Sequence, residues 1–375
     1  MHTTPNCGIL NKAYILQNLM YMKKRNFYLS GLLLVLLLFS ACTRSIQIQA
    51  LRPAAITLPS DVETIVVINR YKPDEKHKFK NFIEGLLTGE RIRLDRLAAD
   101  MAVNNVVKKL SESPRVIVKT VPFELQGTGT WEFPQPLPVD VIKNITRDYK
   151  ADAIVCLEVM DSNSWIRTQD ERRKRTVNGQ TQEYVVSVAT RWVSVDAGWR
   201  VYDGKTGSVL DEHRMRQEMS WNSEAADAKT AVAQLMPTDR AIPDVGAAAG
   251  WDYATRIAPS WVWLNREYYT RAKKNTEFKQ GVIDAQANHW RDAATKWKNL
   301  ADNPDRKIAK RACLNMAVAC EVEGNLDAAL GWAKKGASLG SGKCRNYIYT
   351  LSNRIEDEKR LQIQMQKPNK EEKGE

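Results

Sequence analysis

The first half of the chain alternates short apolar runs with segments of helical periodicity. Residues 62–69, 115–121 and 152–161 are apolar runs of strand length, and residues 91–110 and 138–151 space their apolar side chains as helices do. This β-α-β-α-β order predicts an α/β layer in which the three strands share one sheet. The centre of the first strand is apolar without interruption, so we expect this strand to lie inside the sheet with both faces covered.

The pattern becomes antiparallel after residue 183. A long strand-rich run, 183–203, is followed by a D-x-x-T-G turn at 203–207 and a second run at 208–221, which predicts a hairpin. Residues 61–222 are therefore expected to form an α/β domain, of the α+β kind in that its mixed sheet has an antiparallel edge. The order of elements and the turn resemble the small α/β domains of envelope lipoproteins, such as the curli secretion channel subunit and the lipoprotein activators of penicillin-binding proteins.

The composition becomes helical from residue 223, and residues 223–275 are predicted to be a helical connector. It contains one helix at 223–235, a hinge at 238–251, and an aromatic helix at 248–270 that Pro259 interrupts. Five aromatic residues lie close together in this last segment: Trp251, Trp261, Trp263, Tyr268 and Tyr269. Such a cluster stacks sugars in some proteins, and in others it packs a helix onto a sheet; both interpretations stay open.

The segment 315–339 resembles a tetratricopeptide repeat, a unit of two paired helices. Small residues stand where the two helices would touch, Cys320 replaces the usual aromatic residue, and a less similar copy precedes the segment at 278–301. We therefore predict an all-α region of tetratricopeptide-like helical hairpins at 276–366 and a disordered tail at 367–375. The residues assigned to repeat packing or protein binding are Ala293, Trp297, Ala317, Cys320, Ala329 and Ala333. The helices either bind a peptide in a groove or simply pack on the α/β domain.

The most apolar stretch of the chain, residues 27–39, is too short for a membrane-spanning helix, which needs about 20 residues. Lys23, Lys24 and Arg25 precede it, and Ser40-Ala41-Cys42 follow it, as in a secretory signal that ends in a lipobox. The resemblance predicts that Cys42 carries a lipid. A plain signal or a retained anchor are the alternatives. Residues 1–41 are interpreted as a surplus start plus the signal peptide, with translation beginning at Met22 or Met20, and residues 42–60 as a tether.

The chain is basic, with a net charge of +12. Four of the 56 Lys and Arg residues precede Cys42, so 52 cations and 44 acids follow, a net charge of +8. In an exported protein this charge favours anionic lipid, lipopolysaccharide or cell-wall polymer, or it belongs to a solvated surface; no nucleic-acid partner is expected. The run of Arg172, Arg173, Lys174 and Arg175, expected in a hairpin loop before Asn178-Gly179, is a candidate anion contact.

The chemical motifs of enzymes are absent from the sequence. There is no nucleophile elbow, no phosphate-binding glycine loop, no CxxC and no pair of histidines at metal-binding spacing, so we expect no metal, no cofactor and no enzyme activity. A disulfide from Cys344 to Cys313 or Cys320 is an open alternative.

The lipobox, the opening segment 51–70 and the repeat-like C-terminus together resemble a family of envelope lipoproteins from Bacteroides-type bacteria. The resemblance implies a location at the outer membrane and an architecture, but no activity. In that family, surface export is associated with acidic residues just after the lipidated cysteine; residues 43–47 contain none, so the resemblance implies the periplasmic face. The first functional hypothesis is a lipid-anchored scaffold that binds a protein of unknown identity. The alternatives are a glycan or cell-wall binder that uses the tryptophans, and a hydrolase with an unrecognised site.

Overall fold

The computed structural model describes residues 42–73, 89–129 and 131–367. Contacts divide the chain into two compact units. The sheet unit comprises residues 49–262 together with the chain from 356 onward, and the helical unit comprises the chain up to 48 together with residues 263–355. The predicted signal segment lies outside the described residues, as does the tail from residue 368.

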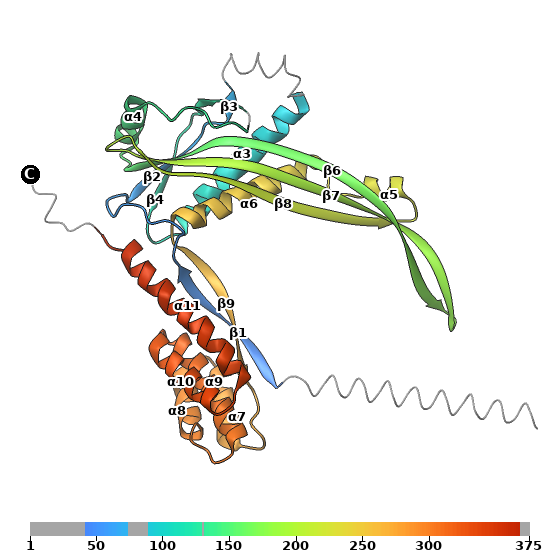
Figure 1. The fold of residues 1–375 in the computed structure, drawn as a ribbon, viewed down its shortest axis with the longest axis vertical. Helices are drawn as coiled ribbons and strands as arrows, with labels where there is room; N and C mark the ends of the chain where they lie inside the picture. The colour runs from blue at the N-terminus through green and yellow to red at the C-terminus, as the bar shows by residue number, and fades with distance from the viewer. Residues whose placement is uncertain (1–41, 74–88, 130, 368–375) are drawn as a thin grey trace, which may run out of the picture. The chain divides into compact units, whose positions relative to one another are not determined.

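A five-stranded mixed sheet forms the centre of the sheet unit, in the order β4-β2-β6-β7-β8 (Figure 1). β2 (Thr64–Asn69) runs parallel to both β4 (Ile117–Thr120) and β6 (Ala153–Val177). β7 (Gln180–Asp203) and β8 (Val209–Ala225) continue the sheet in antiparallel pairing. The prediction that the first strand lies inside a mixed sheet is confirmed, and Ile65, Val66 and Ile68 are completely buried.

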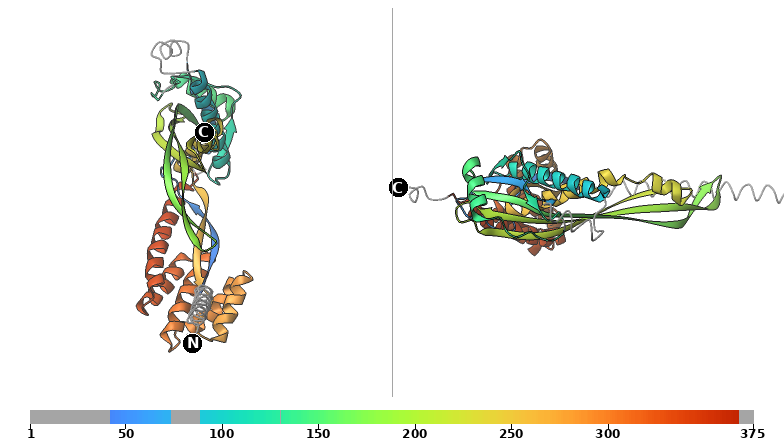
Figure 2. Two further views of the ribbon diagram at one scale, coloured as in Figure 1. Left: turned by 90° about the vertical axis from the view of Figure 1, so that its right-hand side faces the viewer. Right: turned by 90° about the horizontal axis from the view of Figure 1, so that it is seen from above.

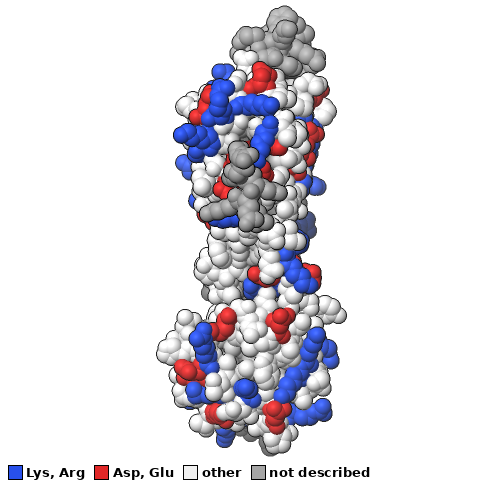
Figure 3. All heavy atoms as spheres, turned by 90° about the vertical axis from the view of Figure 1, so that its left-hand side faces the viewer, with Lys and Arg blue, Asp and Glu red and all other residues white. Residues whose placement is uncertain are grey.

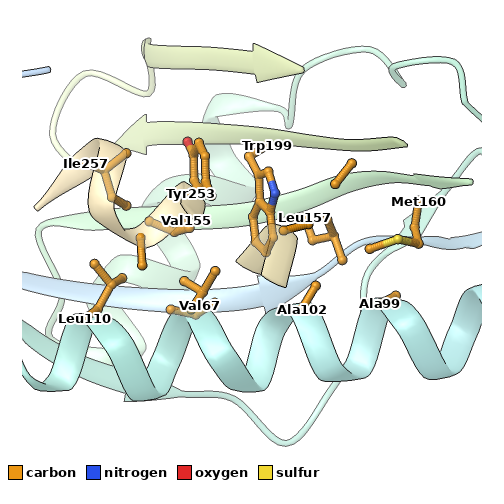
Figure 4. Packing of buried hydrophobic residues seen from close by; sticks show 14 of the residues in the cluster. Val67, Ala99, Ala102, Leu110, Val155, Leu157, Met160, Trp199, Tyr253 and Ile257 are labelled. Atoms are coloured by element: carbon orange, nitrogen blue, oxygen red, sulfur yellow. The ribbon is translucent and has the colours of Figure 1, made fainter. Parts of the chain in front are cut away.

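Three helices position the sheet. α3 (Gly89–Ser111) and α6 (Thr238–Ile257) pack together on one face, where Trp199 of β7 stacks on Tyr253 of α6 with ring centroids 4.9 Å apart (Figure 4). α4 (Val139–Tyr149) covers the other face at the parallel end. α3 and α6 approach so closely that a Cβ atom at Gly250 would lie 2.0 Å from the carbonyl oxygen of Ala102.

The strands β6 and β7 extend beyond the rest of the sheet. The last residue of β8, Ala225, pairs with Ser187, so residues 171–186 form a two-stranded ribbon, with α5 (Ala228–Ala233) on the same side of the strands as α3 (Figure 2). The ribbon turns at Asn178-Gly179, whose φ angles of 51° and 79° are those of a two-residue hairpin turn. The basic run 172–175 therefore lies in strand β6, and the prediction that it forms a loop is wrong. Paired strands need only these two residues to turn.

Three predicted elements before and after the sheet are also wrong. The expected tether contains β1 (Thr43–Arg52), which pairs with β9 (Ser260–Tyr269) in a separate two-stranded sheet. The expected hinge at 238–251 is the body of α6, which includes Pro243. The expected aromatic helix ends at Ile257, and its second half is the strand β9, in which exposed side chains alternate with half-buried or buried ones.

Two smaller differences remain in the sheet unit. Residues 223–225 belong to the end of β8, so the helix expected at 223–235 shortens to α5. β3 (Lys72–Pro73) and β5 (Gln126–Gly127) form a further short parallel pair.

The helical unit contains the predicted series of helices: α7 (Thr276–Gln286), α8 (Trp290–Leu300), α9 (Arg306–Val322), α10 (Leu326–Ser338) and, up to residue 355, α11 (Gly342–Gln364). Its core includes Ala293, Ala317, Ala329 and Ala333, all fully buried, so the prediction that Ala329 is a packing position is confirmed. Gly281 lies against the indole of Trp297, where a Cβ atom would come within 2.7 Å of Nε1. Among the described residues, no helix combines the length and the apolar character needed to cross a bilayer.

Candidate functional site

A buried carboxylate holds β9 and α11 against α9 in the helical unit. Glu321 of α9 has no exposed side-chain surface, and its two oxygens accept hydrogen bonds from Arg266 of β9 at 2.7 and 2.8 Å. Arg354 of α11 donates a third hydrogen bond at 2.9 Å, and the hydroxyl of Tyr347 donates a fourth. Burial acts to raise the pKa of Glu321, but these donors outweigh it and the pKa lies below its usual value. Glu321 is therefore a fixed anion.

Asn315 fixes the end of β9 in the same unit. Its buried amide accepts a hydrogen bond from the N–H of Tyr269 at 2.7 Å and donates one to the carbonyl of Tyr269 at 2.9 Å. The side chain thus occupies the place of a neighbouring strand. Together with Glu321, it makes β9 a rigid wall.

A groove of about 330 Å³ lies along β9. Its lining consists of residues from β9, α9 and α11: Asn265, Arg266, Glu267, Leu314, Lys343, Asn346, Tyr347 and Thr350. The side-chain amides of Asn265 and Asn346 are exposed and have no hydrogen-bond partner within the part of the chain that the structure describes. An amide side chain offers both a donor and an acceptor, which is the combination that a peptide backbone requires. Two of the groups in the lining are therefore of the kind that can pair with a peptide backbone.

The residues predicted for protein binding lie in or against the core of the helical unit. Ala293, Trp297, Ala317, Ala329 and Ala333 are buried between helices and act in packing, while Cys320 is half-buried. None of the six lines the groove. The sequence interpretation missed Asn265, Lys343 and Asn346, because they come from a strand and a helix far apart in the chain.

The positive charges of the predicted anion-binding run, residues 172–175, are largely paired with neighbouring side chains. Arg173 bonds to Glu224 at 2.6 and 2.7 Å and to Glu171 at 2.9 Å, and Lys174 pairs with Glu183 at 3.1 Å. The guanidinium of Arg175 lies 5.5 Å from the ring centroid of Tyr184. Arg172 is exposed and has no ion pair within the described chain. The run therefore offers fewer free cations than its sequence indicates.

Cys42 is the first described residue, and its backbone is fixed to the helical unit. Its carbonyl accepts a hydrogen bond from the N–H of Thr270, immediately after β9, at 2.9 Å. All five cysteines in the described chain are free thiols, so the alternative of a disulfide from Cys344 to Cys313 or Cys320 is absent from this structure. Cys313 and Cys344 pack instead against Gly336.

The aromatic cluster is divided among different elements. Trp251 lies on α6 below the ammonium group of Lys109, at 5.1 Å, and Trp263 on β9 has an exposed fraction of 63%. Tyr268 is buried against Trp290 and Trp297, so it cannot stack on a sugar. Of the five, Trp251, Trp261 and Trp263 keep exposed side chains, and Lys109 also donates to the carbonyl of Trp261 at 3.5 Å.

A second buried carboxylate, Glu158 of β6, organises the sheet unit. It accepts hydrogen bonds from Arg70 at 2.8 Å and from the hydroxyl of Tyr202 at 2.6 Å, and Arg200 lies 3.8 Å away. Burial raises the pKa of Glu158 despite these partners, which act to lower it. Arg70 and Arg200 also donate to the carbonyls of Gln135 and Pro134, at 2.9 and 2.7 Å.

These bonds fix the loop that contains Pro134 and Gln135 to the sheet face that α4 covers at its parallel end. Arg200 lies 4.6 Å from the ring centroid of Phe133, and Arg214 lies between Phe133 and Trp131 at 5.1 and 5.5 Å. Arg70, Arg200 and the Tyr202 hydroxyl are all held in contacts with other protein groups, so we assign the cluster a structural role. No group of three potential metal ligands occurs in the described parts of the chain.

The architecture is that of a mixed α/β domain followed by a helical region, and comparisons with known proteins agree with this division. Residues 62–269 match the family described as domain of unknown function DUF8603, which covers more than half of the chain, so the chain belongs to this family. Residues 279–362 match a second domain of unknown function, DUF6340. No curated protein matches the chain.

Two solved structures show a distant likeness. One is a "putative lipoprotein" from Caulobacter crescentus, 12% identical, covering 31% of this chain and 74% of that one with a TM-score of 0.15. The other is a "putative neuraminyllactose-binding hemagglutinin homolog" from Helicobacter pylori, 12% identical, covering 52% and 84% of the two chains with a TM-score of 0.16. Neither likeness bears on the function of this chain.

Proposed function

We propose that the protein is a lipid-anchored scaffold of the bacterial cell envelope that binds a protein partner through its helical unit and catalyses no reaction. The lipid is attached at Cys42, at the outer membrane, and the protein faces the periplasm. The helices α7–α11 act as tetratricopeptide-like hairpins that support the binding groove. The signal-like segment before Cys42 and the absence of acidic residues at 43–47 support this location.

The observation that carries the proposal is the groove over Glu321. It combines a rigid wall, formed by β9, with the side-chain amides of Asn265 and Asn346, which have no hydrogen-bond partner in the described chain. A buried network that fixes three donors around one carboxylate holds the groove in one shape, which lowers the entropic cost of ordering a ligand. An extended segment of a partner protein would pair its backbone with the two amides.

Site-specific photocrosslinking in the native host tests the proposal. A photoreactive amino acid replaces Thr350 in one strain and Tyr349 in the other; both lie on α11, but only Thr350 lines the groove. We expect a discrete crosslinked adduct from position 350 and none from position 349, which is 74% exposed. The Asn265→Ala and Asn346→Ala variants should each weaken the adduct from position 350. Equal crosslinking at both positions, or none at 350, would refute binding in the groove.

A further inference from the structure

The positive charge of the protein is concentrated in the helical unit. Residues 263–355 contain 17 Lys and Arg against nine Asp and Glu, a net charge of +8. Residues 42–262 contain 30 cations and 29 acids, a net charge of +1, and residues 356–375 contain five and six, a net charge of −1. On the face drawn in Figure 3, Lys and Arg side chains lie in groups along both edges of the helical unit.

Three of these cations lie at the segment 269–271, whose middle residue is bonded to Cys42. Thr270 donates to the carbonyl of Cys42, and the next residue, Arg271, is exposed. The guanidinium of Arg311 donates to the carbonyl of Arg271 at 2.5 Å and lies 4.7 Å from the ring centroid of Tyr269. Lys343 lies 5.5 Å from the same ring. The residue that would carry the lipid is therefore fixed next to a cluster of positive charge.

Few acidic side chains oppose this cluster. Lys343 pairs with Glu267, and Lys273 pairs with Asp305 just before α9. The exposed side chains of Arg271, Lys274 and Lys307 have no ion pair within the described chain. We name these three residues together with Arg311 the basic surface.

We propose that the basic surface binds the phosphate-bearing headgroups of an anionic membrane and holds the helical unit against it. The inference rests on the proposed attachment of lipid at Cys42, because lipidation would place these cations at a membrane. Headgroup attraction acts within about one Debye length, roughly 8 Å at physiological ionic strength. The hydrogen bond from Thr270 keeps Arg271 within this range of the Cys42 backbone. An acidic polypeptide has the same charge, but a lipid on Cys42 would bring the membrane to this surface first.

Vesicle binding by a protein without lipid tests the inference. The probe is residues 42–375 with Cys42→Ser, and the vesicles contain phosphatidylethanolamine with phosphatidylglycerol, or phosphatidylcholine alone. We expect binding to the anionic vesicles only, weakening as salt is added. Since each Lys or Arg near an anionic surface contributes about fivefold, the triple variant Arg271→Ala, Lys274→Ala, Lys307→Ala should bind about 100-fold more weakly.

The control triple variant is Arg172→Ala, Lys174→Ala, Arg175→Ala, which removes the same charge from strand β6. It should bind the anionic vesicles as the parent protein does. Equal losses in both triple variants, no vesicle binding, or binding to polyglutamate but not to vesicles would each overturn the inference; the last would assign the surface to an acidic polypeptide. Because the probe carries no lipid, failure here leaves the lipidation of Cys42 and the groove to be judged by their own tests.

Discussion

Replacing Glu321 with Gln should destabilise the helical unit more than any other single loss of charge in α9. The carboxylate accepts hydrogen bonds from Arg266, Tyr347 and Arg354, and the side chains of the two arginines are only 11% and 20% exposed. A glutamine retains the shape but directs an amide N–H₂ group at donors, and it leaves two largely buried cations without a counter-charge. Breaking a buried ion pair in this way costs about 3–5 kcal/mol.

The effect depends on pH with a defined sign. Because the pKa of Glu321 is lowered in the folded protein, its contribution to stability is complete above the unfolded pKa, about 4.3, and is lost as pH falls through the folded pKa. The wild-type helical unit should therefore lose stability on acidification below about pH 4, and the Glu321→Gln variant should lack this component.

Glu323→Gln is the matched control, two residues further along the chain. Glu323 pairs with Arg291 at 2.6 Å, but the two side chains are 34% and 88% exposed, so solvent screens this pair and it should contribute little to stability. Native-state hydrogen exchange of the α9 and α11 amides measures the local free energy of opening in a protein with two units. If Glu321→Gln and Glu323→Gln lower it by amounts within about 1 kcal/mol of each other, the buried network does not stabilise the unit as argued.

Three further predictions test the packing and the anchor. Gly250→Ala should destabilise the sheet unit in urea unfolding by about 1–3 kcal/mol, because its Cβ would meet the α3 backbone. The control Gly331→Ala, which has open space around it, should be stabilising by about 0.5–1 kcal/mol. Similar effects of the two substitutions would contradict the close contact between α3 and α6. Ala329→Leu should lower the melting temperature of the full chain, because overpacking costs about 1–3 kcal/mol, and the half-buried Ala337→Leu should do less; equal shifts would argue against tight packing at residue 329. Metabolic labelling with a palmitate analogue should mark the wild type and not Cys42→Ser, and equal labelling would exclude lipid at that residue.

The sheet was predictable from sequence wherever its signal was local. The strand at 62–69 is a continuous apolar run, and the hairpin turns contain Asn178-Gly179 and Asp203-Gly204, whose backbone preferences are intrinsic. These features need no knowledge of the rest of the chain. The confirmed burial of Ala329 also follows from local spacing of small residues.

The wrong predictions share a non-local cause. Residues 260–269 form a strand because they pair with β1, which lies at the other end of the described chain. Gly246 and Gly250 look like hinge residues, yet they are small because α6 packs directly on the backbone of α3. The groove was not predictable for the same reason, since Arg266 and Glu321 meet only in the folded unit.

The pairing of β1 with β9 imposes an order on biosynthesis. A chain that emerges from its N-terminus exposes β1 early, but the residues that complete its pairing, up to Thr270, follow only after the whole insert 49–262. The hairpins β6-β7-β8 within that insert have local contacts, which form quickly. The helical unit must therefore close last, and until it does β1 remains an open strand edge, which is the kind of surface that invites misassembly. The groove over Glu321 is lined by β9 and α11, so it cannot exist before that closure.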